Sequence, residues 1–147
     1  MNCSATHEDT VMVYLTRRTT FSAAHRLWSE ALSEEENYAI YDKCANPNGH
    51  GHNYVLEVTV RGEPDPRTGM VMNLTEMKRI TDEQVVKWVD HKHLNFDVPW
   101  LESVIPTAEM LVIAFWKRLE RSFPEGLLYE VKLHETENNV ASYRGER

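Results

Sequence analysis

A thiol and two imidazoles occur within a short run of this chain that extends from Cys44 to Tyr54. His50 and His52 are two residues apart, so on an extended strand their side chains project to the same face. Tyr54 and the alternating apolar residues after it share this parity, which predicts that the face is buried. Imidazoles that face a core need polar partners, because a buried polar group without one is costly. A divalent metal ion is the partner that this pattern indicates.

A third histidine, His25, lies on the apolar face of another alternating segment. Three nitrogen ligands with an open fourth position are typical of catalytic zinc sites. The sequence therefore predicts a Zn²⁺ site formed by His25, His50 and His52. Two other interpretations fit the same residues: ordinary hydrogen-bonded histidines, and a closed structural zinc site with Cys44 as the fourth ligand.

Cys44 can act as a base or nucleophile if its thiol pKa is lowered, which nearby cations, histidines or metal ions can do. Asp90-His91 is a candidate partner, because a carboxylate can orient an imidazole and stabilise its charged form. The alternative for Cys44 is a small buried apolar side chain. The bare dipeptide Asp-His has almost no specificity, and a loop would have to arrange its two side chains.

Glu135 follows an apolar stripe formed by Tyr129, Val131 and Leu133, and it shares their parity. A carboxylate is therefore predicted on a core-facing side, where it needs a hydrogen-bond donor. It can pair with an arginine, or it can accept two parallel hydrogen bonds from a flat ring with adjacent N–H groups. The residues by themselves leave both possibilities open.

Five motifs of this chain resemble, in the same order, the signature segments of the 6-pyruvoyl-tetrahydropterin synthase family. Together they cover the chain from about residue 11 to residue 145. The motifs are Phe21–Leu27, Cys44–Tyr54, Asp65–Leu74, Asp90–Lys92 and Glu135–Asn139. Five motifs in sequence make a far more specific match than any one of them.

The resemblance implies a role for each residue singled out above. The three histidines would hold zinc, and Cys44, Asp90 and His91 would form a catalytic triad at a subunit boundary. Glu135 would anchor the aminopyrimidinone edge of a pterin, assisted by the main chain of the segment from Thr107 to Glu109. The family's common Thr-Thr-Glu-Asn reads Thr-Ala-Glu-Met here, which puts a side-chain role of Ala108 or Met110 in doubt.

The implied activity is that of a zinc-dependent lyase that converts 7,8-dihydroneopterin triphosphate to 6-pyruvoyl-tetrahydropterin and releases triphosphate, in tetrahydrobiopterin biosynthesis. The alternative is the sister activity that forms 6-carboxy-tetrahydropterin from the same substrate. Five residues separate Cys44 from His50, a spacing shared with animal-type pyruvoyl-forming enzymes, whereas carboxy-forming enzymes usually have a shorter one. A non-catalytic, zinc-stabilised module is a third interpretation.

Length and composition indicate one globular domain over residues 11–147, preceded by a flexible leader over residues 1–10. The formal net charge of −7 argues against a nucleic-acid partner, because a basic footprint is absent. No apolar run is long enough for a membrane span, and the first residues lack the order of a signal peptide. With only two cysteines, a reducing compartment is expected, so the predicted location is cytoplasmic.

Alternating apolar residues predict strands over residues 11–24, 51–62, 127–133 and 140–143. Capping signals and helical spacing predict a short helix over 33–41 and two long helices over 73–89 and 106–123. This order indicates an α+β fold, with a four-stranded antiparallel sheet and two long helices on one face. Two open sheet edges favour pairing between chains. The resembled family has the ββααββ tunnelling fold, in which trimers close a barrel and stack in pairs, so a homohexamer is expected.

Overall fold

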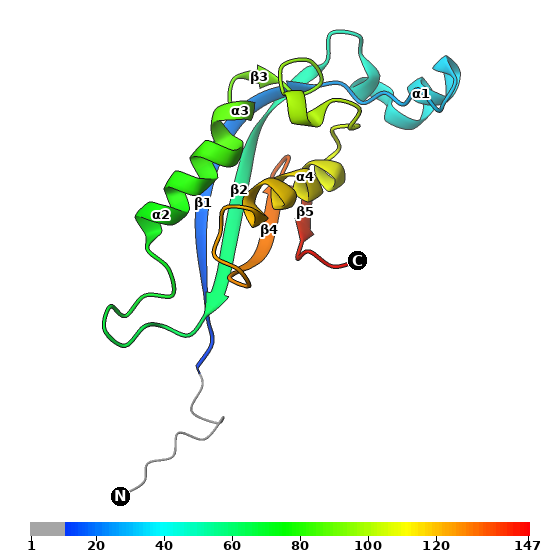
Figure 1. The fold of residues 1–147 in the computed structure, drawn as a ribbon. Coiled ribbons are helices and arrows are strands. Elements are labelled where there is room, and N and C mark those ends of the chain that lie inside the picture. The colour runs from blue at the N-terminus through cyan, green and yellow to red at the C-terminus, as the bar shows by residue number, and fades with distance from the viewer. Residues whose placement is uncertain (1–10) are drawn as a thin grey trace, which may run out of the picture.

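The computed structural model describes residues 11–147, which form a long twisted sheet with helices over one face (Figure 1). The predicted leader, residues 1–10, lies outside the described residues. The sheet has the strand order β3-β1-β2-β4-β5. The strands are β1 (Val13–His25), β2 (His50–Gly62), β3 (Lys92–His93), β4 (Leu128–His134) and β5 (Val140–Tyr143). The predicted α+β class is confirmed.

The prediction of a four-stranded antiparallel sheet is wrong, because the sheet has five strands and is mixed. The additional strand β3 is two residues long and pairs in parallel with Ala23 and Ala24 of β1. The main-chain N–H groups of His91 and Leu94 donate to carbonyl oxygens of β1, over 2.6 and 2.8 Å. So short a strand has no alternating pattern, and its pairing comes from main-chain groups that a sequence pattern does not reveal.

The long pair β1–β2 is the frame of the sheet. Its antiparallel register is continuous from Val13 opposite Gly62 to His25 opposite His50. The pairing of β2 with β4 shifts between Thr59 and Val60, which is a bulge in the ladder. The two ends of the β1–β2 pair are thus far apart, and the histidines lie together at one of them.

The helices are α1 (Glu34–Tyr41), α2 (Leu74–Thr81), α3 (Lys87–Val89) and α4 (Ala108–Glu120). A π-helical segment, Asp82–Val86, joins α2 to α3, so the predicted long helix over 73–89 is one rod with a widened turn. This rod and α4 lie over the same face of the sheet (Figure 1). Helix α1, whose existence was predicted from the capping box between Ser33 and Glu36, projects from the end of the sheet that carries β3.

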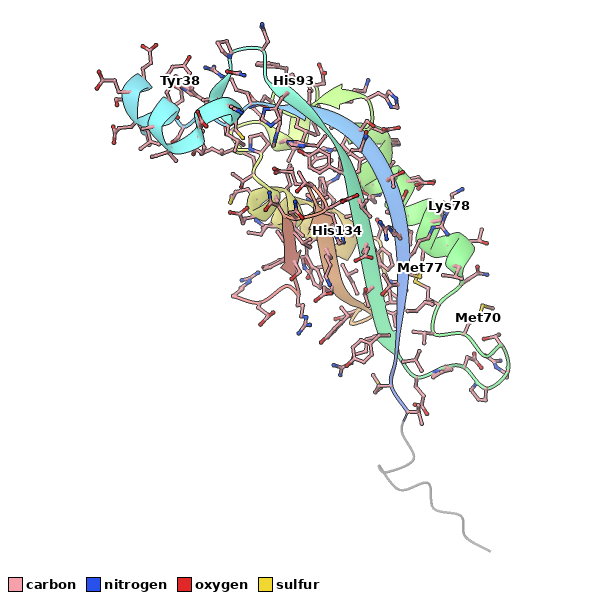
Figure 2. All side chains as sticks on the ribbon, turned by 180° about the vertical axis from the view of Figure 1, so that it is seen from behind. Tyr38, Met70, Met77, Lys78, His93 and His134 are labelled. Atoms are coloured by element: carbon pink, nitrogen blue, oxygen red, sulfur yellow. The ribbon has the colours of Figure 1, made fainter. Side chains whose placement is uncertain are left out.

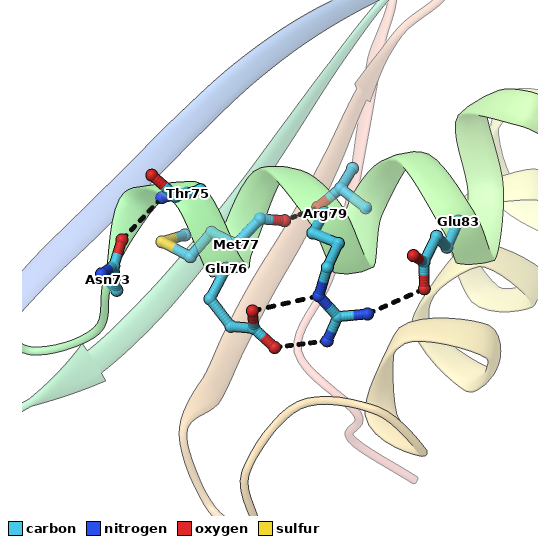
Figure 3. Close-up of polar contacts among 7 residues, drawn as sticks. Asn73, Thr75, Glu76, Met77, Arg79 and Glu83 are labelled. Atoms are coloured by element: carbon cyan, nitrogen blue, oxygen red, sulfur yellow. Dashed lines mark hydrogen bonds and ion pairs between the residues drawn. The ribbon is translucent and has the colours of Figure 1, made fainter.

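Side-chain hydrogen bonds fix the starts of both long helices. Asn73 accepts a hydrogen bond from the N–H of Thr75 over 2.9 Å at the start of α2, and Thr107 accepts one from the N–H of Met110 at the start of α4. Figure 3 shows the Asn73 cap together with Arg79, which pairs with Glu76 and Glu83 on the exposed side. These caps satisfy N–H groups that have no partner within the helix.

The core lies between the helices and the sheet. Its buried members come from β1, β2, β4 and both long helices, and the fully buried ones include Tyr54, Leu56, Met77, Leu111, Phe115, Leu119 and Leu133. Tyr54 and Leu56 follow His52 at the same parity, so the face that carries the histidines is the core face, as predicted. None of the helices in the described part of the chain has the length and apolarity that a bilayer crossing would need.

Candidate metal centre and substrate cavity

Strands β1 and β2 bring the three predicted metal ligands together. His25 lies opposite His50 in the ladder, and Ala23 lies opposite His52. The centroids of the three imidazole rings are 4.8–5.0 Å apart, and one ligand atom from each ring lies within 4.8 Å of the others. This group could hold a metal ion, because three imidazole nitrogens converge on one point.

The turn before β2 allows this close approach. Gly49 has a φ of 73°, a left-handed conformation that residues with a β-carbon rarely adopt. A β-carbon at Gly49 would lie 2.6 Å from the main-chain oxygen of His25. Only glycine therefore fits between the end of β1 and the first residue of β2.

His25 is held in the orientation that a metal ligand needs. Its side chain is fully buried, and its Nδ1 lies 2.8 Å from the carbonyl oxygen of Pro106. Because a carbonyl can only accept, Nδ1 carries the hydrogen and Nε2 has a free lone pair. This Nε2 lies 3.2 Å from Nε2 of His50. Burial lowers the pKa of His25 to about 4, so the ring is neutral, the form that binds metal.

His52 supplies the strongest sign that a cation belongs here. Its Nε2 is buried and has no hydrogen-bond partner in residues 11–147. Burial also lowers the pKa of His52, although the nearby Glu135 carboxylate opposes this shift. A neutral ring nitrogen that is buried without a partner is costly unless it binds something. The three residues thus fit a divalent metal ion of the kind that accepts imidazole nitrogen.

Glu135 lies directly beside this group. Its Oε1 is 3.7 Å from Nε2 of His52, and both side chains are mostly buried. Glu135 also lines a cavity of about 650 Å³ together with Thr107 and Ala108 at the start of α4. The structure therefore brings all three predicted substrate-binding residues to one cavity next to the histidines. The arginine partner that the sequence left open for Glu135 is not found among the described residues, in which the carboxylate lies beside the imidazole of His52.

Cys44 lies in a 3₁₀ turn, Asp42–Ala45, that precedes β2. Its thiol is free and half-buried. Burial raises the pKa of Cys44, and the carboxylates of Glu135 and Asp42 raise it further. Within one chain the thiol is therefore held in its neutral form. Among the described residues, the possible ligand atoms that lie within 4.8 Å of one another are those of the three histidines, without Cys44; this fits an open site better than a closed one.

Asp90 and His91 are paired with each other but lie apart from Cys44. Asp90 Oδ1 is 2.9 Å from His91 Nδ1 and also accepts a hydrogen bond from the N–H of Ser22 over 3.0 Å. The hydrogen bond from the N–H of Ser22, and to a smaller extent that from His91, lowers the pKa of Asp90. His91 has a φ of 60°, a left-handed conformation that lets its side chain face that of the neighbouring residue Asp90. The imidazole of His91 is 81% exposed.

The position of this pair is the edge of the sheet, next to β3. His91 lines a hollow together with Ser22 and Asn53, whose side chains alternate away from the core face that carries the metal ligands. In residues 11–147 no hydrogen bond or ion pair joins Cys44 to Asp90 or His91. One chain thus assembles the histidines and the Glu135 cavity, but it does not assemble the predicted triad.

Two groups near His25 were not predicted to be part of the site. The Pro106 carbonyl orients the ring, and the hydroxyl of Tyr54 lies 3.3 Å from the same Nδ1. Burial raises the pKa of Tyr54, with Glu135 as the next cause, so the phenol is neutral. The parity of Tyr54 with His50 and His52 carried the signal for its position. The sequence holds no signal for the Pro106 carbonyl, because it is a main-chain group from a distant loop.

Comparison with known proteins gives one consistent result. A sequence model of 6-pyruvoyl tetrahydropterin synthase matches residues 14–146. The chain is 50% identical to 6-pyruvoyl tetrahydrobiopterin synthase of Homo sapiens over 132 residues, which are 90% of this chain and 91% of that protein. For the enzyme of that name from Dictyostelium discoideum the identity is 52% over 134 residues, 91% of this chain and 97% of that protein.

A solved structure agrees with these sequences. The Caenorhabditis elegans 6-pyruvoyl tetrahydropterin synthase superposes on this chain with a TM-score of 0.89 at 40% identity, covering 93% of this chain and 98% of that one. A match of this extent in sequence and in fold cannot arise from a shared motif alone. The chain therefore belongs to the 6-pyruvoyl tetrahydropterin synthase family.

Proposed function

We propose that this chain is a 6-pyruvoyl-tetrahydropterin synthase, a lyase that releases triphosphate from 7,8-dihydroneopterin triphosphate. The observation that carries the proposal is the placement of Glu135 beside His52: a carboxylate that lines a cavity, and could recognise a ring there, lies 3.7 Å from the candidate metal-binding histidines. Family membership supports it, since the relatives are named for this product.

Recognition of the pterin ring falls to Glu135 and the start of α4. An ionised carboxylate can accept two parallel hydrogen bonds from the adjacent N–H groups of an aminopyrimidinone. The first N–H groups of a helix have no partner within it, so those of Ala108 and Glu109 are available to an acceptor on the ring. The Ala108 position therefore acts through its main chain, and replacing the family's usual threonine leaves that contact possible.

The three histidines would hold a zinc ion beside Glu135, which lines the proposed substrate cavity. When bound, zinc supplies Lewis acidity, which would make the C–H bonds next to coordinated side-chain hydroxyls easier to ionise. The protein's own contribution is to keep the imidazoles neutral and aligned. The Pro106 carbonyl fixes the tautomer of His25, and burial keeps the rings of His25 and His52 from taking up a second proton.

Cys44 is the proposed base, and it needs help from a cation. Its thiol pKa is raised in the isolated chain, so deprotonation requires a positive charge nearby. His91, held by Asp90, can provide an imidazolium. Because this pair lies on an exposed sheet edge, we propose that it meets Cys44 of a neighbouring chain in a homo-oligomer, most simply a hexamer. A reducing compartment, expected from the cysteine content, suits a free thiol.

The overall reaction needs no external oxidant. Cys44 removes a proton from a side-chain carbon, the C–O bond to triphosphate breaks, and the resulting enol rearranges to a ketone. The dihydropterin ring gains the two hydrogens that the second side-chain hydroxyl position loses, so oxidation and reduction balance within one molecule.

The direct test is incubation with 7,8-dihydroneopterin triphosphate, followed by identification of the pterin and measurement of released triphosphate. We expect 6-pyruvoyl-tetrahydropterin and one triphosphate for each substrate consumed. Formation of 6-carboxy-tetrahydropterin would assign the sister activity instead. Absence of turnover by a zinc-loaded, folded protein would contradict the proposal altogether.

A further inference from the structure

The segment that follows Asp90 and His91 is fastened to β1 along its whole length. The N–H of His91 donates to the Ser22 carbonyl, β3 pairs with the next two residues of β1, and the N–H of Leu94 donates to the Ala24 carbonyl. These contacts are all made by main chain. At the next residue, Asn95, the contact with the chain after β1 is made by the side chain instead.

Asn95 binds both main-chain groups of one residue. Its Oδ1 accepts a hydrogen bond from the N–H of Arg26 over 2.8 Å, and its Nδ2 donates to the carbonyl oxygen of Arg26 over 2.9 Å. The Asn95 carboxamide thus makes the two main-chain hydrogen bonds that a neighbouring strand would otherwise make with Arg26. Arg26 is the residue directly after the proposed metal ligand His25. Both bonds are partly shielded from water, which makes them costly to break without replacement.

Arg26 also contacts the turn that contains Cys44. Its Nε donates to the carbonyl oxygen of Ala45 over 3.0 Å, and its guanidinium stacks on the ring of Trp28 at 4.1 Å. The N–H of Leu27 donates to the carbonyl of Cys44 over 2.7 Å. Arg26 and its neighbour therefore touch the three segments that carry His25, Cys44 and the Asp90–His91 pair.

We propose that Asn95 is a positioning residue for the Asp90–His91 pair, acting through the main chain of Arg26. The inference rests on the proposed function, in which that pair serves the reaction. Asn95 fixes the distance between the end of the metal-binding strand and the segment that ends in β3. Its loss leaves the ligands of the metal and the Glu135 cavity in place, but it frees the catalytic pair to move.

Asn95→Ala tests this with kinetics. We expect kcat to fall at least tenfold, with KM and zinc content within twofold of the unsubstituted protein. Asn95→Gln keeps both the oxygen that can accept from the N–H of Arg26 and the N–H group that can donate to its carbonyl, so it should recover part of kcat. An unspecific loss of structure would lower zinc content and raise KM as well, and it would not respond to the conservative replacement.

Asn73→Ala is the matched control. Asn73 also uses its side-chain oxygen to accept from a main-chain N–H, at the start of α2 (Figure 3). It lies towards the end of the sheet opposite to β3; in Figure 2, Met70 and His93 mark these two ends. This variant should lose thermal stability and keep kcat. If the two variants have the same kcat, Asn95 has no role beyond stability and the inference is overturned.

Amide hydrogen exchange provides a readout that does not need turnover. In Asn95→Ala the amides of His91 and Leu94 should exchange at least tenfold faster, while those in the middle of β1 and β2 should be unchanged. A protein without activity on the pterin triphosphate would refute the proposed function, and exchange alone would then decide whether Asn95 fixes this segment. Unchanged exchange at His91 and Leu94 would refute the role of Asn95 even in an active enzyme.

Discussion

Nε2 of His52 lies 3.7 Å from Oε1 of Glu135, so the proposed metal centre and the proposed ring anchor share a boundary. The two side chains come from β2 and from the residue just after β4, neighbouring strands of the sheet. Their separation is set by sheet geometry and not by a flexible loop. A pterin held by Glu135 would therefore have its side chain placed within reach of the histidines by the spacing of two strands.

Replacing His50 by alanine should abolish bound zinc, because two imidazoles rarely hold a catalytic zinc alone. Metal analysis of the purified protein measures this. His134→Ala is the matched control: His134 pairs with Glu57 over 3.1 Å, away from the metal group, and its loss should leave zinc content unchanged. Near-stoichiometric zinc in the His50→Ala protein would overturn the assignment of the ligands.

Replacing Glu135 by glutamine should weaken pterin binding by about 1.5–3 kcal/mol, the usual effect of losing a hydrogen bond to a charged group. One oxygen of the double acceptor becomes a donor that faces the ring's own donors. Titration with a pterin, monitored by calorimetry, measures the change. Glu57→Gln should bind pterin normally, and the same result for Glu135→Gln in a folded protein would leave Glu135 with only a structural role.

Mixing two inactive variants tests whether neighbouring chains share a site. Cys44→Ala and His91→Ala subunits, dissociated and reassembled together, should regain part of the activity, because some sites then combine an intact Cys44 with an intact His91. Mixing Cys44→Ala with His50→Ala should give no recovery, since both residues belong to the same half of the site. A triad built within one chain would show no recovery in either mixture, and sedimentation of an active monomer would exclude the shared site.

Acidification should destabilise the metal-free protein through His25. Its pKa is about 4 in the folded chain, against about 6.5 for an unperturbed histidine, so the unfolded state binds the proton first. Stability from this residue is fully present above pH 6.5 and decreases as the pH falls towards 4, by up to about 3 kcal/mol. Urea denaturation of chelator-treated protein at several pH values measures this slope. His25→Gln should have a flatter slope, and equal slopes would show that His25 does not carry the effect.

The sequence correctly predicted that the three histidines lie together on the core face, because period-two alternation is a local property. His50 and His52 lie on the face of Tyr54, and strand pairing adds His25 to them. It could not predict β3 or the geometry of the Asp90–His91 pair. Both depend on main-chain hydrogen bonds to β1 and on the left-handed φ of His91, which side-chain type does not encode. The family resemblance, and not the pattern of residues, drew attention to that pair.

Only a hydrogen atom fits on the α-carbon of Gly49, between the end of β1 and the start of β2. Every single-nucleotide missense change in a glycine codon introduces a β-carbon. A one-step variant at this position must therefore displace main chain at the end of β1 or the start of β2, since Gly49 contacts the main chain of His25 and directly precedes His50. Any substitution at residue 49 is thus expected to disturb the group of three histidines, although Gly49 has no side chain that could be a ligand.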